Sequence, residues 1–356
     1  YVMLTKSKHK SISFELEGTN SAGDLGAAAS VSFQHRNLFR GSETFMVKFR
    51  GAYEAISGLQ PGYKNHNYTE YGVETSINFP SFLFPFLTSD FKRRIRATTE
   101  FGLQYNYQLR PEFSRTIASA SWSYKWMQKQ KIQHRIDLLD ISYLYLPWIS
   151  PQFQEDYIDK DKDNYILRYN YENRLIVRMG YTYNYNSAGG TLVNNTITSN
   201  SYSIRAGFES AGNILYGVSK MINMRKNKDG EYAILGIPYA QYLKGDFDFA
   251  KNIIIDHRNS LAFHAGIGVA VPYGNAKVVP FEKRYFSGGA NSVRGWSVRN
   301  LGPGSFAGDG NFMNQSGDIK LDASIEYRTR LFWKFRGAAF IDAGNIWTIR
   351  EYENQP

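Results

Sequence analysis

Three charged residues in the last third of the chain could form a network of ion pairs. They are Arg294, Glu326 and Asp342. A guanidinium group presents a planar fork of N–H donors that matches the two oxygens of a carboxylate. Glu326 stands between Ile325 and Tyr327, and Asp342 also has apolar neighbours. Since successive side chains of a strand point to opposite faces, we expect both carboxylates on the face away from those apolar side chains.

The sequence holds none of the common catalytic or cofactor motifs. It has no cysteine, and its six histidines are not spaced as metal ligands. A Gly-x-Ser-x-Gly elbow, a Walker loop and a His-Glu-x-x-His pair do not occur. The run DKDKDN, residues 159–164, begins like a calcium loop but lacks its glycine and its final glutamate. We therefore expect no enzyme activity, no metal and no cofactor.

The composition favours a membrane β-barrel. Aromatic residues make up 16% of the 356 residues, and transmembrane barrels carry girdles of such residues. No run of about 18 apolar residues occurs, so a transmembrane helix is excluded. The net charge of +10 comes from scattered basic residues. This scatter fits lumenal positions or anionic lipid headgroups better than nucleic acid.

Strict alternation of apolar and polar residues is the strongest structural signal. It runs from Ile95 to Arg110, with Phe101, Leu103 and Tyr105 on one face. That length suits a tilted membrane strand with extensions beyond the bilayer. About fourteen strands are expected, at residues 10–19, 25–36, 43–56, 66–79, 92–109, 114–126, 173–187, 200–209, 213–221, 231–247, 258–272, 293–301, 317–330 and 335–347.

One stretch, residues 131–172, fits two alternatives. It could form an extra hairpin, or it could be an inserted turn with a short helix. Ser150 followed by Pro151 would begin such a helix. In either case no linker divides the chain, which is expected to form one domain.

Three sequence blocks carry a family resemblance. They read PFEKRYFSGGANSVRGWSVRNLGPGSF from Pro280, GDIKLDASIEYR from Gly317 and GAAFIDAGNIW from Gly337. In this order they resemble the BamA/TamA superfamily of outer-membrane insertases and two-partner secretion transporters. HRNLFRGSETF from His35 resembles that family's turn between the second and third strands. The resemblance therefore spans nearly the whole chain.

The first block resembles the family's long extracellular loop, which folds back into the barrel. The loop tip is Val293, Arg294, Gly295 and Trp296, with Trp where Phe or Tyr is usual. The resemblance implies that Arg294 binds the lumenal Glu326 and Asp342, because an unpaired buried charge costs several kcal/mol. Gly288, Gly289 and Gly295 are expected to permit positive φ and close backbone approach around the tip.

The resemblance also implies the architecture. The fold class would be an all-β, transmembrane antiparallel barrel in the outer membrane, with sixteen strands in the native protein. Residues 1–356 would be one barrel domain with about fourteen of them. The last two strands and the family's N-terminal periplasmic domains would then lie outside this sequence.

The function that the resemblance implies is to fold and insert client barrel proteins into the outer membrane, without nucleotide hydrolysis. Unfolded clients, accessory assembly subunits and outer-membrane lipid would be the partners. A client strand would pair with the edge of the first strand, whose Ile12, Phe14 and Leu16 would face lipid. Two alternatives stay open, namely a secretion transporter of the same superfamily and a passive porin.

Overall fold

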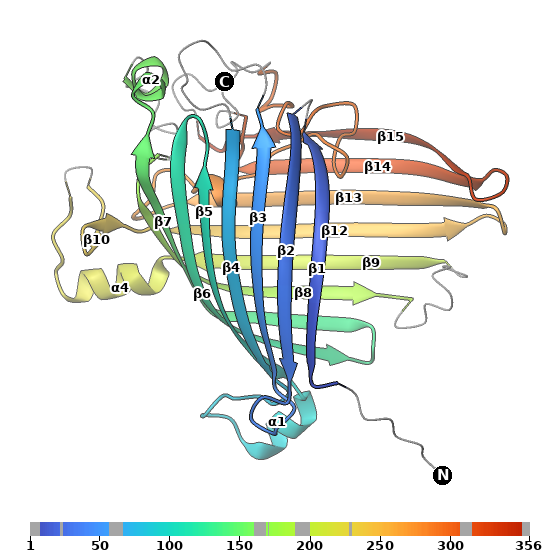
Figure 1. The fold of residues 1–356 in the computed structure, drawn as a ribbon, viewed down its shortest axis with the longest axis horizontal. Coiled ribbons are helices and arrows are strands. Elements are labelled where there is room, and N and C mark those ends of the chain that lie inside the picture. The colour runs from blue at the N-terminus through green and yellow to red at the C-terminus, as the bar shows by residue number, and fades with distance from the viewer. Residues whose placement is uncertain are drawn as a thin grey trace. The chain divides into compact units, whose positions relative to one another are not determined.

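The fold, seen here in a computed structural model, is built from long antiparallel strands (Figure 1). The residues that the structure describes are 8–21, 24–56, 67–159, 169, 171–188, 200–227, 230–306 and 315–350. The chain divides into two compact units. Among the described residues, no helix is long and apolar enough to cross a membrane.

The first unit takes in Tyr1–Trp126, Asp137–Lys160 and Asn173–Leu175. Its strands are hydrogen-bonded in chain order. They are β1 (Lys10–Ser21), β2 (Asp24–Arg36), β3 (Thr44–Ala55), β4 (Asn67–Phe79), β5 (Thr98–Leu109), β6 (Phe113–Gln128) and β7 (Ile132–Ile149), of which β6 and β7 extend into the residues of the second unit. Helix α1 (Ser89–Ile95) precedes β5, while α2 (Pro151–Phe153) and the π-helix η1 (Gln154–Asp159) follow β7.

One face of the first unit is a continuous apolar surface. The register places Phe14, Val31, Phe49, Val73 and Tyr105 directly opposite one another on five successive strands. All five side chains are exposed. A row of exposed apolar and aromatic side chains across so many strands is typical of a wall that faces lipid.

The opposite face of the first unit is polar. Glu15 lies 3.1 Å from the Nζ atom of Lys48, and Glu17 lies 3.2 Å from the Nη2 atom of Arg50. Lys125 makes a similar ion pair with Glu100, at 2.8 Å. The alternation in the sequence therefore separates a lipid-facing surface from a charged one, as expected for a barrel with a polar lumen.

The second unit takes in Met127–Ile136, Asp161–Glu172 and Ile176–Pro356. Its strands are also hydrogen-bonded in chain order. They are β8 (Arg174–Asn186), β9 (Ser201–Ala211), β12 (Tyr242–Ile254), β13 (Asn259–Pro272), β14 (Ile319–Arg330) and β15 (Arg336–Trp347), of which β8 begins in the residues of the first unit. A separate small hairpin of β10 (Ala233–Ile234) and β11 (Ile237–Pro238) follows helix α4 (Asn213–Met221), and the 3-10 turn η2 (Phe281–Lys283) follows β13.

The second unit shows the same division of faces. Phe247, Ile267 and Leu321 lie opposite one another on β12, β13 and β14, and all three are exposed. On the other face, His264 lies 3.5 Å from Asp248 and 3.5 Å from Asp322. The all-β, antiparallel fold class that the alternation predicts is thus confirmed.

Two expected strands are wrong. Residues 213–221 form helix α4. Ile214, Val218 and Ile222 are four residues apart, a spacing that puts them on one helix face but also fits one face of a strand. Residues 293–301 form turns, since Trp296 N–H donates to the carbonyl of Val293 at 3.2 Å. Local turn bonds take the place of a ladder there.

Three further boundaries differ from expectation. Residues 92–95 belong to α1, because Arg96 takes up a left-handed conformation (φ 53°) that ends the helix before β5. The expected strand 231–247 is broken by Leu235 and Gly236, both at positive φ, so that β12 begins only at Tyr242. In 131–172, a long strand, β7, is followed by the short helix that Pro151 begins. Residues 160–168 and 170 lie outside the described residues.

Candidate functional site

The candidate site lies on the long loop between β13 and β14, within the second unit. This loop covers residues 273–318, of which 307–314 are outside the described part. It folds back on itself, because isolated bridges join Tyr285 to Gly317 and Ser287 to Leu301. The fold-back directs the turn of residues 293–296 toward β14 and β15.

Arg294 at the tip is bound by two carboxylates. Its Nε atom donates to Oδ2 of Asp342 at 2.7 Å, and its Nη2 atom donates to Oδ1 of the same residue at 2.7 Å. Its backbone N–H also donates to Asp342, at 3.0 Å. Its Nη1 atom donates to Glu326. The structure thus brings together the three charged residues that the sequence singles out.

The strands fix the positions of both carboxylates. Glu326 lies opposite Phe340 in the register of β14 and β15, and Asp342 is two residues further along β15, on the same face. The ring of Phe340 lies under the guanidinium, with its centroid 3.5 Å from the Cζ atom of Arg294. Arg328 makes a further contact with Glu326, at 2.5 Å. The guanidinium is therefore held by charge, by a bidentate fork and by a cation–π contact.

Burial is uneven across this network. The side chain of Asp342 is 4% exposed, while that of Arg294 is 23% exposed. Water therefore reaches part of the guanidinium. The paired carboxylates raise the pKa of Arg294, with Asp342 as the larger influence, so this loop residue carries its charge at any physiological pH.

The glycines near the tip do not all behave as expected. Gly288 and Gly289 have positive φ values of 96° and 90°. A Cβ atom at Gly289 would lie 2.6 Å from Val298, and one at Gly288 would clash with the carbonyl of Ser297. Gly295 is different, because it does not have a positive φ and the space around it is open. The expectation of positive φ and close approach is thus wrong for Gly295.

The two remaining residues of the tip have different surroundings. Val293 is buried, whereas Trp296 is exposed. The carbonyl of Trp296 accepts a hydrogen bond from the N–H of Gly289 at 2.8 Å. This bond closes the turn and holds Arg294 in the middle of it.

A second set of contacts anchors the arm that leads to the tip. Arg284 Nε lies 3.3 Å from Oδ1 of Asp318, and both side chains are 0% exposed. Tyr285 donates its hydroxyl to Asp246 of β12 at 2.7 Å. Burial, followed by the hydrogen bond to Asp246, raises the pKa of this tyrosine, so the hydroxyl keeps its proton. Sequence reasoning missed this set of contacts.

Lys283 extends the same anchor to β9. Its Nζ atom lies 3.2 Å from Glu209, which also pairs with Arg178 at 3.1 Å. Tyr242 of β12 donates to Glu209 as well. The sequence holds one signal for the contacts of Lys283 and Tyr285, because their partners Glu209 and Asp246 are acidic residues on predicted strands. The buried pair of Arg284 with Asp318 has no such signal, because it lies outside regular strands.

The expected seam strand lies in the first unit. The side chains of Ile12, Phe14 and Leu16 all point to the apolar face, and those of Phe14 and Leu16 are 75% and 88% exposed. One edge of β1 pairs with β2. No other described strand of the first unit pairs with its second edge.

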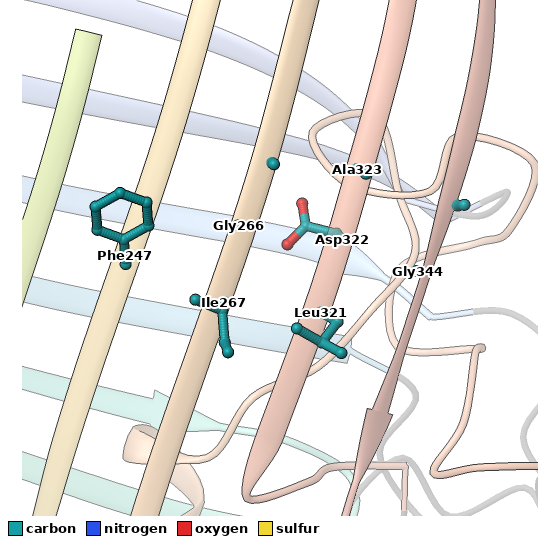
Figure 2. A pocket seen from close by; sticks show the side chains of 9 residues that line it. Phe247, Gly266, Ile267, Leu321, Asp322, Ala323 and Gly344 are labelled. Carbon is teal, nitrogen blue, oxygen red and sulfur yellow. The ribbon is translucent and has the colours of Figure 1, made fainter.

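An apolar hollow of about 600 Å³ marks the outer face of the second unit. Figure 2 shows Phe247, Ile267 and Leu321 around it, on three successive strands. Ala323 and Ala343, which lie opposite each other on β14 and β15, line it as well, and such small residues leave room on this face. The acidic residue beside the hollow, Asp322, has its carboxylate 3.5 Å from His264 on the polar face. The hollow is therefore an apolar depression of the wall.

The described residues include histidines, aspartates and glutamates, the side chains that bind metal ions in the absence of cysteine. Among them, no cluster of three His, Asp or Glu side chains could hold a metal ion.

The two faces of the strands and the inward-folded loop define an outer-membrane protein of the transmembrane β-barrel class. The family description of the Omp85 superfamily domain matches residues 12–355. The chain therefore belongs to the Omp85 superfamily.

Individual relatives agree with this assignment. The chain is 31% identical over 97 residues to the outer membrane protein assembly factor BamA of Neisseria meningitidis serogroup B, strain ATCC BAA-335 / MC58. That match covers 25% of this chain and 12% of the relative.

One of the solved structures that match the chain shares its fold. The crystal structure of Haemophilus ducreyi BamA lacking POTRA domains 1–3 superimposes with a TM-score of 0.59 at 16% identity. It covers 96% of this chain, which spans 58% of that one. CdiB from Escherichia coli gives a TM-score of 0.49 at 9% identity, covering 94% of this chain and 56% of that one.

Proposed function

We propose that this protein folds client β-barrel proteins and inserts them into the outer membrane. Membership of the Omp85 superfamily and the similarity to a protein named as an assembly factor support this function. Unfolded outer-membrane proteins would be the clients, and accessory assembly subunits would be further partners. The protein would act as a template without hydrolysing nucleotide and would not be an enzyme.

The observation that carries the proposal is the edge of β1. The carbonyl of His9 accepts a hydrogen bond from Arg36 N–H at 2.7 Å, so the backbone groups of His9 point to β2. Backbone groups alternate along a strand, and the register from Lys10 to Ser21 has no bulge. The N–H and C=O groups of Ile12, Phe14 and Leu16 therefore point to the other edge. Such groups form a template for an added strand.

The loop tip has a structural role in this proposal. With Arg294 bound to Glu326 and Asp342, the tip stays against the inner face of β14 and β15. The arm is fixed independently, through Arg284 and Tyr285. A loop held at two places would keep the lumen in one shape while the β1 edge exchanges partners.

Two other functions remain as candidates within this architecture. A secretion transporter of the same superfamily would pass one dedicated polypeptide through the lumen. A passive porin would conduct ions and would not assemble clients.

Reconstitution of the full-length protein into liposomes would separate the three functions. An unfolded client barrel is added from outside, and its folding is followed by heat-modifiable migration and by protease protection. We expect clients to become membrane-integrated at a rate well above that in empty liposomes. A polypeptide that arrives inside the liposome without integrating would favour the transporter. Conductance without any client folding would favour the porin.

A further inference from the structure

The connection between β4 and β5 in the first unit combines aromatic and basic residues. We call residues 80–96 the interfacial segment. It carries Phe82, Phe84 and Phe86, followed by α1 with Phe91. Four basic residues, Lys92, Arg93, Arg94 and Arg96, stand against one acidic residue, Asp90. The function proposed above does not use this segment.

The aromatic half of the segment is held against the apolar face of the wall. Phe82 and Phe84 pack on Tyr124 of β6, with ring centroids 4.7 Å and 6.2 Å away. Thr99 accepts a hydrogen bond from Leu83 N–H at 2.9 Å and donates to the carbonyl of Ser81 at 2.8 Å. These contacts fix the segment where β4 ends and β5 begins (Figure 1).

The packed rings continue into an aromatic belt. Tyr124 contacts Trp122, which contacts Phe101, with centroid distances of 5.9 Å and 5.5 Å. Phe39, on the turn between β2 and β3, lines an apolar hollow with both Phe101 and Trp122. Aromatic side chains at the end of lipid-facing strands occupy the headgroup level of a bilayer. This end of the first unit therefore lies at a membrane surface.

The basic half of the segment has no partners within the described protein. Arg93, Arg94 and Arg96 are exposed, and no ion pair forms at these residues or at Lys92 among the described residues. Arg40, on the β2–β3 turn at the same end, is likewise exposed and without an ion pair there. The one nearby carboxylate on that turn, Glu43, is taken by the N–H groups of Phe39 and Gly41.

We propose that the interfacial segment binds anionic phospholipid headgroups. Phe86, which is 86% exposed, and Phe91 would enter the headgroup layer. Arg93, Arg94 and Arg96 would bind the phosphates beside them. Charge complementarity selects this occupant, since four unpaired cations next to exposed aromatic rings match an anionic surface with an apolar interior. The proposal depends on the membrane location of the protein and not on its insertase function.

The test compares two variants that lose the same number of charges. R93Q/R94Q/R96Q removes the exposed cations of the interfacial segment. K220Q/R225Q/K226Q removes three exposed cations on the connection between β9 and β12, and it serves as the control. The full-length proteins are purified in micelles that contain equal amounts of phosphatidylglycerol and phosphatidylcholine, and the retained lipids are counted by native mass spectrometry.

We expect the wild-type protein and the control to retain phosphatidylglycerol in preference to phosphatidylcholine. A basic residue near an anionic surface strengthens binding about fivefold, so the R93Q/R94Q/R96Q variant should lose roughly a hundredfold in phosphatidylglycerol affinity. F86S should weaken the retention of both lipids. Heat-modifiable migration verifies that each variant is folded.

Two results would overturn the proposal. Equal phosphatidylglycerol retention by the wild type and R93Q/R94Q/R96Q would show that the segment does not bind this lipid. An acidic protein would then be the partner that fits the segment. Equal losses in both triple variants would show that net charge alone governs retention.

Discussion

Arg294 is bound in a way that lysine cannot reproduce. Two of its nitrogens donate to the same carboxylate of Asp342, and a third donates to Glu326. The planar group also stacks on Phe340. An ammonium group is a point charge without the fork or the flat face. The identity of the side chain, and not only its charge, should therefore matter at the tip.

Replacement of Arg294 tests this point. Leaving a carboxylate unpaired at a dry, fully buried site would lower the stability of a protein by about 3–5 kcal/mol. Because the guanidinium is partly exposed, we expect R294A to lower the free energy of unfolding by about 1.5–3 kcal/mol, the range for hydrogen bonds to charged groups. R294K should recover part of this. Urea unfolding in detergent, followed by heat-modifiable migration, measures the free energy of unfolding of the wild type, R294A and R294K. Equal stability of these three proteins would contradict the prediction.

Glu43 gives a pH-dependent contribution to stability at the β2–β3 turn. Backbone hydrogen bonds, first that of its own amide and then those of Gly41 and Phe39, outweigh desolvation and lower the pKa of this carboxyl group. A group whose pKa is lower in the folded state stabilises the protein above its unfolded pKa. That stability is lost as the pH falls through the folded pKa, below the ordinary range of glutamate.

The E43Q variant should therefore lack this part of the pH dependence. We expect E43Q to be less stable than the wild type at neutral pH, and the difference should shrink as the pH falls below the ordinary glutamate range. Urea midpoints measured over a series of acidic pH values test this. A difference that stays constant with pH would contradict it.

At the scale of elements, the orientation of backbone groups in β1 leads to a sharper test of the seam. Proline at Phe14 removes an N–H that points away from β2, so the β1–β2 ladder remains intact. Alanine at the same position removes the ring but keeps the N–H. The two substitutions therefore separate the backbone edge from the apolar side chain.

We expect F14P to reduce the rate of client assembly more than tenfold. F14A should retain most of the wild-type rate. An unmade backbone hydrogen bond in a membrane costs several kcal/mol, and about 1.4 kcal/mol already slows a reaction tenfold. The reconstituted folding assay measures this, with heat-modifiable migration as the check that both variants fold. Normal assembly by F14P would contradict a role for this edge.

The sequence predicted long strands well and connections poorly. Alternation located β1 to β4 within two residues, because one face meets lipid and the other meets water along the whole strand. Helix α4 was mistaken for a strand, since its nine residues are too few for a period of 3.6 to stand out from alternation. The tip was mistaken for a strand because turn bonds leave no periodic signal.

The candidate site shows the same limit. Glu326 and Asp342 could be predicted because strand parity gives the face of each residue. Arg284 and Asp318 could not, since the path of the loop brings them together and periodicity does not report loop paths. Residues 92–96 of the interfacial segment were likewise assigned to an expected strand, of residues 92–109, although 92–95 belong to helix α1.

At the scale of the whole molecule, the barrel requires both units to present one face to lipid and the other to water. Leu103 of β5 in the first unit and Ile325 of β14 in the second are exposed on apolar faces. Their neighbours, Gln104 and Ser324, point to the opposite faces, where the ion pairs lie. The chain has no cysteine, so single cysteines can be introduced at these four positions without other changes.

Spin labels at the four positions should alternate in their accessibility in liposomes. We expect labels at 103 and 325 to be relaxed by oxygen, which concentrates in lipid, and labels at 104 and 324 to be relaxed by a water-soluble nickel chelate. The reason is that side chains alternate between lipid and lumen along every strand of a transmembrane barrel. The same pattern in both units would show that the strands of each unit span the bilayer. If either unit lacked the alternation, its strands would not span the bilayer, and the proposed use of the β1 edge within the membrane would fail with it.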